Sequence, residues 1–351
     1  MAKAQSPLPL DLPTLSRALE DDPEGRLEQL KREVLKASEA QFEVQEEGYR
    51  VALMWAWDEL PKVFNKPLLA WASASQARLR RLAAGAAPLS HNEFGEKSKK
   101  LLKKLCGDKD RGVRLVSMDR LLDDLPESLE LAKRWTKSDD PTVRAMVAQR
   151  VRNVPTPEIP RSLEVLALLA EDPEPEVHYA VASSYWDLYE REPREVLRAV
   201  RGMAESEVES IRWAAALNFM QHLLADRFEA TRATLRSWLR DGRPELRWTL
   251  ARSILFLTVN GQSLPILRML FEDKDPSNRA RVVQHLIGAF DPLAEHYPSV
   301  ARILRRAVSD GDAAVRAAAS AGEDKLGLDF AKLPDDGHAL VINSNGTGPH
   351  H

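Results

Sequence analysis

Residues 172–178 read Asp-Pro-Glu-Pro-Glu-Val-His, and residues 310–316 read Asp-Gly-Asp-Ala-Ala-Val-Arg. Both segments run from an acidic turn to an aliphatic residue that is followed directly by a basic one. The same order recurs along the chain, and the basic position is occupied in turn by Arg80, Arg114, Arg144, His178, Arg212, Arg247, Arg279 and Arg316. The gaps between these positions are 34, 30, 34, 34, 35, 32 and 37 residues. A repeat of this length is typical of arrays built from stacked supersecondary units.

The residues around each turn predict two helices per repeat. At Asp140-Pro141, for example, the Asp side chain is suited to cap free N–H groups at a helix start, and Pro fits the first helical turn. Beyond it, Val143, Val147 and Val151 recur at the spacing of one helix face. Further prolines then break the chain before a second helix. Each repeat is therefore expected to be a helical hairpin, and neighbouring hairpins must stack to bury their apolar faces.

The acidic turn and the Val-Arg or Val-His pair of these segments resemble the HEAT-repeat family. The resemblance extends over residues 70–322 and implies an all-α fold, a right-handed α-solenoid of about seven to eight HEAT-like helical hairpins. The tail sequence Asn343-Ser-Asn-Gly-Thr-Gly-Pro has no helical periodicity and no core residues. We therefore expect an N-terminal helical cap at 1–66, a HEAT-like array at 67–326 and a flexible C-terminal tail at 327–351.

The composition fits a folded chain without an overall basic character. Hydrophobic residues make up 44% and charged residues 29%, which excludes a disordered chain. With 50 Lys and Arg against 53 Asp and Glu, the formal charge is -3, so a strongly basic nucleic-acid arm is excluded as a global feature. No stretch has the length and apolarity of a secretory signal or a membrane span. We expect a cytoplasmic protein without a membrane partner.

A search for catalytic patterns finds little. The sequence has no Gly-rich phosphate loop, no His-Glu-x-x-His motif and no paired-cysteine metal pattern. The single cysteine, Cys106, ends the helical stripe at 101–105, which favours core packing over nucleophilic use. His178 occupies the basic position of its repeat, which favours a structural role. We therefore expect no catalytic residue, no metal site and no cofactor.

The repeated basic residue itself allows two interpretations. Arg144 shares a helix face with Val147 and Ala148, which places it at the edge of the core. There it would meet the turn Asp of its own or the next repeat, and an Asp–Arg ladder would tie neighbouring hairpins together. Direct contact with a ligand is the other interpretation. The sequence favours the ladder and leaves ligand contact open.

The position after the basic residue carries an aromatic side chain in three consecutive repeats, as Tyr179, Trp213 and Trp248. Equivalent positions of a helical stack line one surface, so these rings are expected to form a stripe, with Trp186 two helical turns further on. Together with nearby arginines, the stripe predicts a stacking and cation–π surface on the concave face for a protein or peptide. Packing between repeats is the alternative. The predicted binding residues are Tyr179, Trp186, Trp213, Trp248, Arg212, Arg247 and Arg252.

A second pattern begins at Trp57-Asp58 and continues with Trp71-Ala-Ser73 and an Arg-Arg pair. It resembles the DNA alkylation repair glycosylases that are built from HEAT-like repeats. In that family an Asp four residues after the first Trp stabilises the cationic sugar, and Pro61 stands at that place here. The resemblance implies a DNA-binding groove formed by Trp57, Asp58, Arg80, Arg81, Arg114 and Arg144.

The sequence as a whole predicts a non-enzymatic scaffold that holds a protein or peptide partner, its anchors aromatic or cationic, on a concave face. A DNA-binding or DNA glycosylase-like protein is the alternative, with nucleic acid as the partner.

Overall fold

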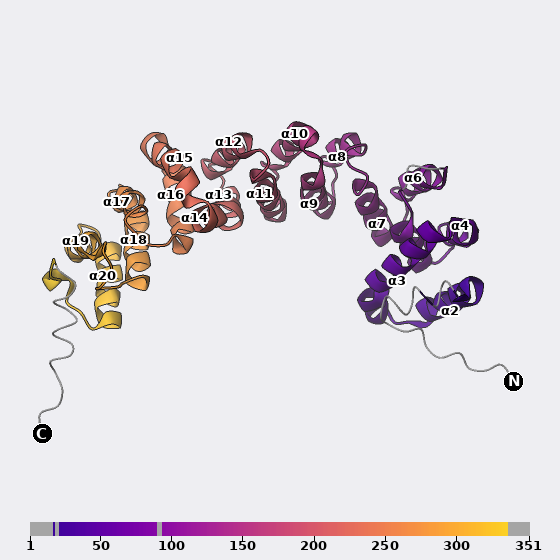
Figure 1. Ribbon diagram of the computed structural model, residues 1–351, viewed down its shortest axis with the longest axis horizontal. Coiled ribbons are helices and arrows are strands. Elements are labelled where there is room, and N and C mark those ends of the chain that lie inside the picture. The colour runs from indigo at the N-terminus through magenta and orange to yellow at the C-terminus, as the bar shows by residue number, and fades with distance from the viewer. Residues whose placement is uncertain (1–16, 18–20, 90–92, 336–351) are drawn as a thin grey trace, which may run out of the picture. The chain divides into compact units, whose positions relative to one another are not determined.

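The computed structural model describes residues 17, 21–89 and 93–335, and every regular element within them is a helix. The chain divides into two compact units, Met1–Val165 and Leu166–His351. Each unit is a stack of helical hairpins, so the predicted all-α solenoid architecture is confirmed (Figure 1). In the described part of the chain, no helix combines the length and the apolarity needed to cross a bilayer.

Within its described residues, unit 1 contains four hairpins and the start of a fifth. The pairs are α2 (Pro23–Lys36) with α3 (Glu39–Glu59), α4 (Pro61–Trp71) with α5 (Ala77–Ala86), α6 (Glu93–Leu105) with α7 (Arg111–Leu122), and α8 (Leu129–Trp135) with α9 (Pro141–Arg150). Two 3-10 turns, η1 (Val151–Asn153) and η2 (Thr156–Glu158), lead into α10 (Ile159–Leu169), which crosses into unit 2. Helix α5 packs between α3 and α7, and the core beneath them includes the fully buried Trp57 and Leu53.

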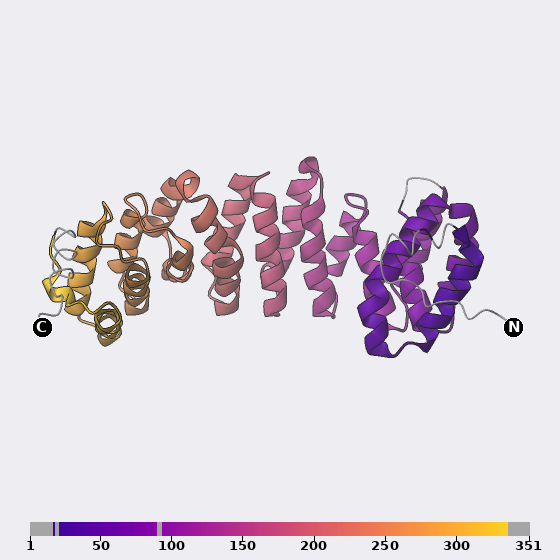
Figure 2. The same ribbon diagram turned by 60° about the horizontal axis from the view of Figure 1, so that its bottom comes forward.

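Unit 2 continues the same pattern. Its helices are α11 (Pro175–Tyr189), α12 (Pro193–Ala204), α13 (Glu209–Ala215), the π-helical turn η3 (Ala216–Met220), α14 (Gln221–Asp226), α15 (Phe228–Asp241), α16 (Pro244–Ser253), η4 (Ile254–Phe256), α17 (Leu264–Phe271), α18 (Pro276–Gly288), α19 (Tyr297–Val308), α20 (Ala313–Leu326) and η5 (Phe330–Lys332). Helices α11, α13, α16, α18 and α20 pack in succession as one layer, and α15, α17 and α19 form part of the other (Figures 1 and 2). Surfaces shared by several repeats therefore run across consecutive helices of one layer.

The acidic turn residues cap helix starts, as their sequence positions predict. The Asp140 carboxylate accepts a hydrogen bond from the Thr142 N–H at 3.0 Å, and Asp312 accepts one from Ala314 at 2.8 Å. Each bond satisfies an N–H group that has no partner within its helix, which stabilises the start by about 1 kcal/mol. The turns thus set where the second helix of each hairpin begins.

The repeated basic residue fastens the turn that precedes its own helix. In seven of the eight repeats, its side chain reaches the carbonyl oxygen six residues upstream, and Arg247 reaches the carbonyl of Gly242, five residues upstream. The Arg-to-carbonyl distances lie between 2.6 and 2.9 Å. Because a bond to the preceding turn recurs in every repeat, this position serves the fold, as the structural interpretation predicts.

Some of these arginines also pair with the turn Asp of the next repeat, as the ladder interpretation predicts. The N···O distances are 2.8 Å for Arg80–Asp108, 2.6 Å for Arg247–Asp273 and 2.7 Å for Arg279–Asp310. The bond from Arg279 lowers the pKa of Asp310, and the bond from Arg80 does the same for Asp108. These pairs connect one hairpin to the next within each unit.

The first residues of the predicted flexible tail are packed. Phe330 is fully buried, and its short 3-10 turn packs against α19. The Tyr297 hydroxyl donates a hydrogen bond to the carbonyl of Pro334 at 3.1 Å. The structure therefore differs from the expectation at 327–335, because Phe330 and Leu333 supply apolar side chains that cover the end of the array. Residues 336–351, with the rest of the predicted tail, lie outside the described residues.

Candidate functional site

Two of the three aromatic residues at equivalent repeat positions contact each other directly. The ring centroids of Trp213 on α13 and Trp248 on α16 are 5.1 Å apart, and the planes meet at 80°. Both side chains are partly exposed. Edge-to-face pairs of this kind contribute about 0.5–1.5 kcal/mol beyond their buried area. The expected register of equivalent side chains therefore holds for Trp213 and Trp248, and their rings remain at the surface.

Two guanidinium groups lie over the Trp248 ring. The distance from the guanidinium carbon to the ring centroid is 4.7 Å for Arg212 and 4.3 Å for Arg252, both within the range of cation–π attraction. Arg252 also donates hydrogen bonds to the side chains of Asn278, at 2.7 Å, and Ser277, at 3.2 Å. Neutral oxygens thus hold this guanidinium, and its charge is not cancelled.

The surroundings of Trp248 carry an excess of positive charge. Within the described residues, Arg212, Arg252 and Arg281 form no ion pair, and Nε of Arg212 is buried without a hydrogen-bond partner. Burial and the positive charges of Arg281 and Arg212 lower the pKa of Arg252, although Asp275 and Glu209 oppose the shift. Arginine nevertheless stays protonated at neutral pH. We call this group the Trp–Arg cluster; it consists of Trp213, Trp248, Arg212, Arg252 and Arg281.

The other predicted binding residues lie apart from this cluster. Arg247 is engaged in the ladder, with Asp273 and the Gly242 carbonyl as its partners. Tyr179 is 38% exposed and has no ring contact with another described aromatic residue. Trp186 belongs to a second aromatic group, because its ring stacks on Tyr189 and His222 at centroid distances of 5.8 and 5.2 Å. The predicted stripe is therefore divided.

Arg281 belongs to the Trp–Arg cluster but was not among the binding residues predicted from the sequence. This residue follows Ala280, which occupies the aromatic position of its repeat, and α18 packs against α16. The position that carries an aromatic residue in three other repeats is Ala280 here, so the repeat alignment points to Ala280 and not to Arg281. The short Arg279-Ala-Arg281 sequence was the available signal, since it places a second arginine on the helix that packs against α16.

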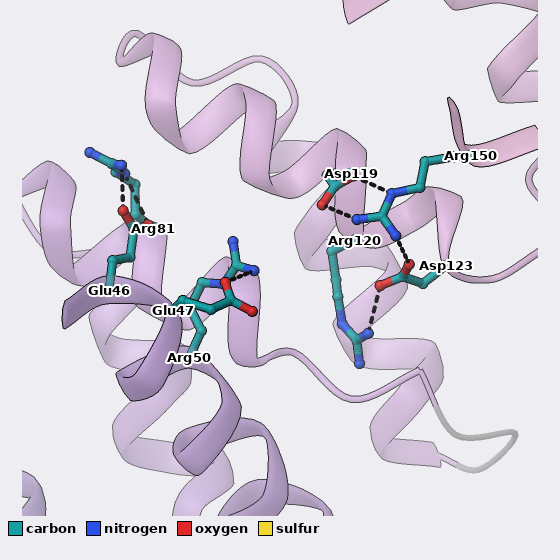
Figure 3. A network of polar contacts seen from close by, with 8 residues as sticks. All are labelled: Glu46, Glu47, Arg50, Arg81, Asp119, Arg120, Asp123 and Arg150. Atoms are coloured by element: carbon teal, nitrogen blue, oxygen red, sulfur yellow. Dashed lines mark hydrogen bonds and ion pairs between the residues drawn. The ribbon is translucent and has the colours of Figure 1, made fainter. Parts of the chain in front are cut away.

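The residues of the DNA-binding alternative mostly serve the fold of unit 1. Trp57 has no exposed surface, so its ring cannot stack on a base in this conformation, whereas Asp58 is exposed. Arg80 pairs with Asp108. Figure 3 shows Arg81 paired with Glu46, at an N···O distance of 2.5 Å.

The remaining two residues of that alternative are held by backbone carbonyls. Arg114 donates to the carbonyls of Asp108 and Lys109, and Arg144 donates to that of Ser138. Phosphate contacts need Lys or Arg groups that face solvent. Arg114 and Arg144 instead donate hydrogen bonds to the turns of their own repeats. No observation therefore favours DNA binding by the six residues of that alternative.

Comparisons with known proteins leave the family and the function open. No protein-family model matches the chain, and no curated protein matches it. The X-ray structure of YibA of Escherichia coli is similar at 17% identity and a TM-score of 0.35, over 74% of this chain and 98% of that one. A chain of the Pds5–Scc1 complex is similar at 14% identity and a TM-score of 0.33, over 82% of this chain and 60% of that one. Since both TM-scores are low, the assignment of a helical-repeat fold rests on the helices and turn contacts described above.

Proposed function

We propose that this protein is a scaffold that holds an acidic segment of a partner protein on the Trp–Arg cluster. One observation carries the proposal: Trp248 lies under two guanidinium groups that form no ion pair among the described residues. Trp and Arg are the residue types most enriched at the energetic centres of protein interfaces. A partner that supplied carboxylates would complete the ion pairs that the chain itself leaves unmade.

The charge of the cluster selects the chemistry of the anchor. A cationic anchor would meet repulsion from Arg212, Arg252 and Arg281. A carboxylate can instead accept two parallel hydrogen bonds from one guanidinium, which is the strongest arrangement open to it. The expectation of a cationic anchor on these rings is therefore replaced by that of an anionic one.

The ring geometry favours a protein over single-stranded nucleic acid. Binding of a single strand relies on ring faces that are open for successive bases to stack on. Here the planes of Trp213 and Trp248 meet at 80°, and guanidinium groups already lie over Trp248. Carboxylates and apolar side chains of a peptide do not need open parallel rings, so they fit this surface better.

Two synthetic peptides of equal length and equal apolar content provide the first test, one rich in Asp and Glu and the other with Lys and Arg at the same places. By fluorescence anisotropy, the acidic peptide should bind, and its affinity should fall as salt rises from about 50 to 300 mM. The Arg212→Gln/Arg252→Gln double variant should bind it about tenfold or more weakly. Arg198→Gln is the matched control, because that side chain is 76% exposed and pairs with Glu195 away from the cluster.

Replacement of the rings gives an independent readout. Trp213→Ala/Trp248→Ala should weaken binding of the acidic peptide while the helical melting curve changes little. If the double variant unfolds, Trp248→Phe keeps a ring in place and still tests its contribution. Equal binding of the two peptides, or stronger binding of an oligothymidine strand than of the acidic peptide, would overturn the proposal.

A further inference from the structure

We propose that a cavity between α15, α17 and the start of α19 binds a small molecule that carries two or more phosphate groups. The cavity measures about 920 Å³ and lies wholly within unit 2. Its walls come from α15, from the loop before α17, from α17 itself and from the first turn of α19. Pockets for small ligands commonly enclose about 300–1,000 Å³, so the size suits a metabolite and not a folded domain.

The lining of this cavity is basic. Arg236 and Arg240 lie one turn apart on α15, and Arg268 faces the same space from α17. The one acidic residue in the lining is Glu295, and it forms no ion pair with these arginines. Three guanidinium groups against one carboxylate leave a net positive charge.

The arginines of the cavity lack carboxylate partners. Arg232, one turn before Arg236 on α15, lies 3.5 Å from a carboxylate oxygen of Glu229, and on α19 Arg306 lies 3.5 Å from Glu272. Among the described residues, Arg236, Arg240 and Arg268 have no such ion pair; the same holds for Arg302 on α19, which does not line the cavity. What distinguishes the three is that their unpaired charges converge on one cavity.

Arg236 is the most telling of the three. Its Nε is buried and has no hydrogen-bond partner among the described residues, which is costly for a charged group. A phosphate placed against this guanidinium would offset its charge. The arginine fork binds phosphate oxygens in pairs, and several arginines around one cavity favour a ligand with several phosphates.

Other lining residues can hold the rest of a ligand. Asn260 fixes the loop before α17, because its side chain accepts hydrogen bonds from the N–H groups of Gln262 and Ser263 at 2.9 and 3.0 Å. Leu264 of α17 and Ile303 of α19 add apolar groups to the lining. The cavity thus combines basic and apolar groups, as a phosphorylated organic molecule requires.

The test uses the full chain and inorganic probes. Pyrophosphate and tripolyphosphate should raise the thermal melting temperature and give saturable heat in calorimetry, with tripolyphosphate the tighter of the two. Sulfate at equal ionic strength should have little effect. Adenosine triphosphate is a further arm, because tighter binding than tripolyphosphate would show that the apolar groups of the lining contribute.

Variants separate this cavity from general surface charge. Arg236→Gln/Arg268→Gln should weaken tripolyphosphate binding about tenfold or more, whereas the control Arg198→Gln should not. Because Arg268 is exposed, the single variant Arg268→Gln keeps the test open if the double variant misfolds. The Arg212→Gln/Arg252→Gln variant should bind tripolyphosphate normally, so failure here is distinct from failure at the Trp–Arg cluster. Absence of binding at millimolar probe, or an equal loss in Arg198→Gln, would refute the proposal.

Discussion

Two groups of arginines in this protein, the network of Figure 3 and the Trp–Arg cluster, differ in whether carboxylates pair with them. In unit 1, the network of Figure 3 matches each arginine with a carboxylate: Arg81 with Glu46, Arg50 with Glu47, Arg120 with Asp123, and Arg150 with Asp119 and Asp123. In unit 2, Arg212 and Arg252 of the Trp–Arg cluster lie over a Trp ring, and Arg252 also donates to amide and hydroxyl oxygens. The positive charge of Arg281 acts on Arg252, and none of the three arginines forms an ion pair within the described residues.

The difference shows that the number of arginines does not identify a binding surface. A guanidinium that is paired with a carboxylate has its charge balanced, so an incoming anion must compete with that carboxylate. A guanidinium without a carboxylate partner can form an ion pair with an incoming anion directly. The network of unit 1 therefore serves the fold, and the Trp–Arg cluster is the region whose charge a partner can complete.

The largest expected effect comes from breaking a pair in unit 1. Arg81→Gln leaves Glu46, whose side chain is 10% exposed, without its closest cation. Removing one partner of a buried pair costs about 3 kcal/mol of unfolding free energy. Urea unfolding followed by circular dichroism measures the loss. Arg252→Gln in the Trp–Arg cluster should lose about 1–2 kcal/mol, because it removes a cation–π contact and hydrogen bonds to neutral oxygens but leaves no buried charge unpaired.

A second variant of Glu46 sharpens this result. The Arg81→Gln/Glu46→Gln double variant should recover part of the lost stability, because it leaves no unpaired buried charge. Burial already raises the pKa of Glu46, so the loss in Arg81→Gln should shrink as acid protonates the carboxyl. Equal losses for Arg81→Gln and Arg252→Gln would contradict the distinction between the two regions.

An intermediate effect is expected from acid at the ladder. The bond from Arg279 holds the pKa of Asp310 below its ordinary value of 3.8. The pair therefore stabilises the fold fully above that ordinary value, and the stabilisation is lost as the pH falls through the lower pKa of the folded state. The stability difference between wild type and Asp310→Asn, measured by urea unfolding from about pH 7 to 3, should narrow as the pH falls.

The matching control lies in the Trp–Arg cluster. The difference between wild type and Arg212→Gln should stay nearly constant over the same pH range, because no carboxylate is bonded to this arginine among the described residues. A difference that narrows equally in both variants would mean that Arg212 has an acidic partner in solution.

The fold could be read from the sequence because its signals are local. An Asp before Pro141 caps a helix, and a basic residue six positions after a turn oxygen reaches that oxygen in repeat after repeat. The candidate site was only partly predictable. The repeat spacing correctly placed Trp213 beside Trp248. Whether an arginine forms an ion pair, however, depends on acidic residues in other repeats. Arg247, for example, was predicted to bind a partner but pairs with Asp273, and the repeat spacing alone could not decide between the two.

The smallest expected effect tests the cluster from the other direction. Arg281 has no ion pair among the described residues, and its charge acts against that of Arg252. Arg281→Gln should therefore leave the unfolding free energy unchanged or raise it by up to about 0.5 kcal/mol, since it removes like-charge repulsion. The same variant should bind the acidic peptide more weakly, because one positive charge is gone from the surface. A variant that gains or keeps stability while losing affinity separates a binding arginine from a structural one, and a loss of both would place Arg281 with the paired arginines of unit 1.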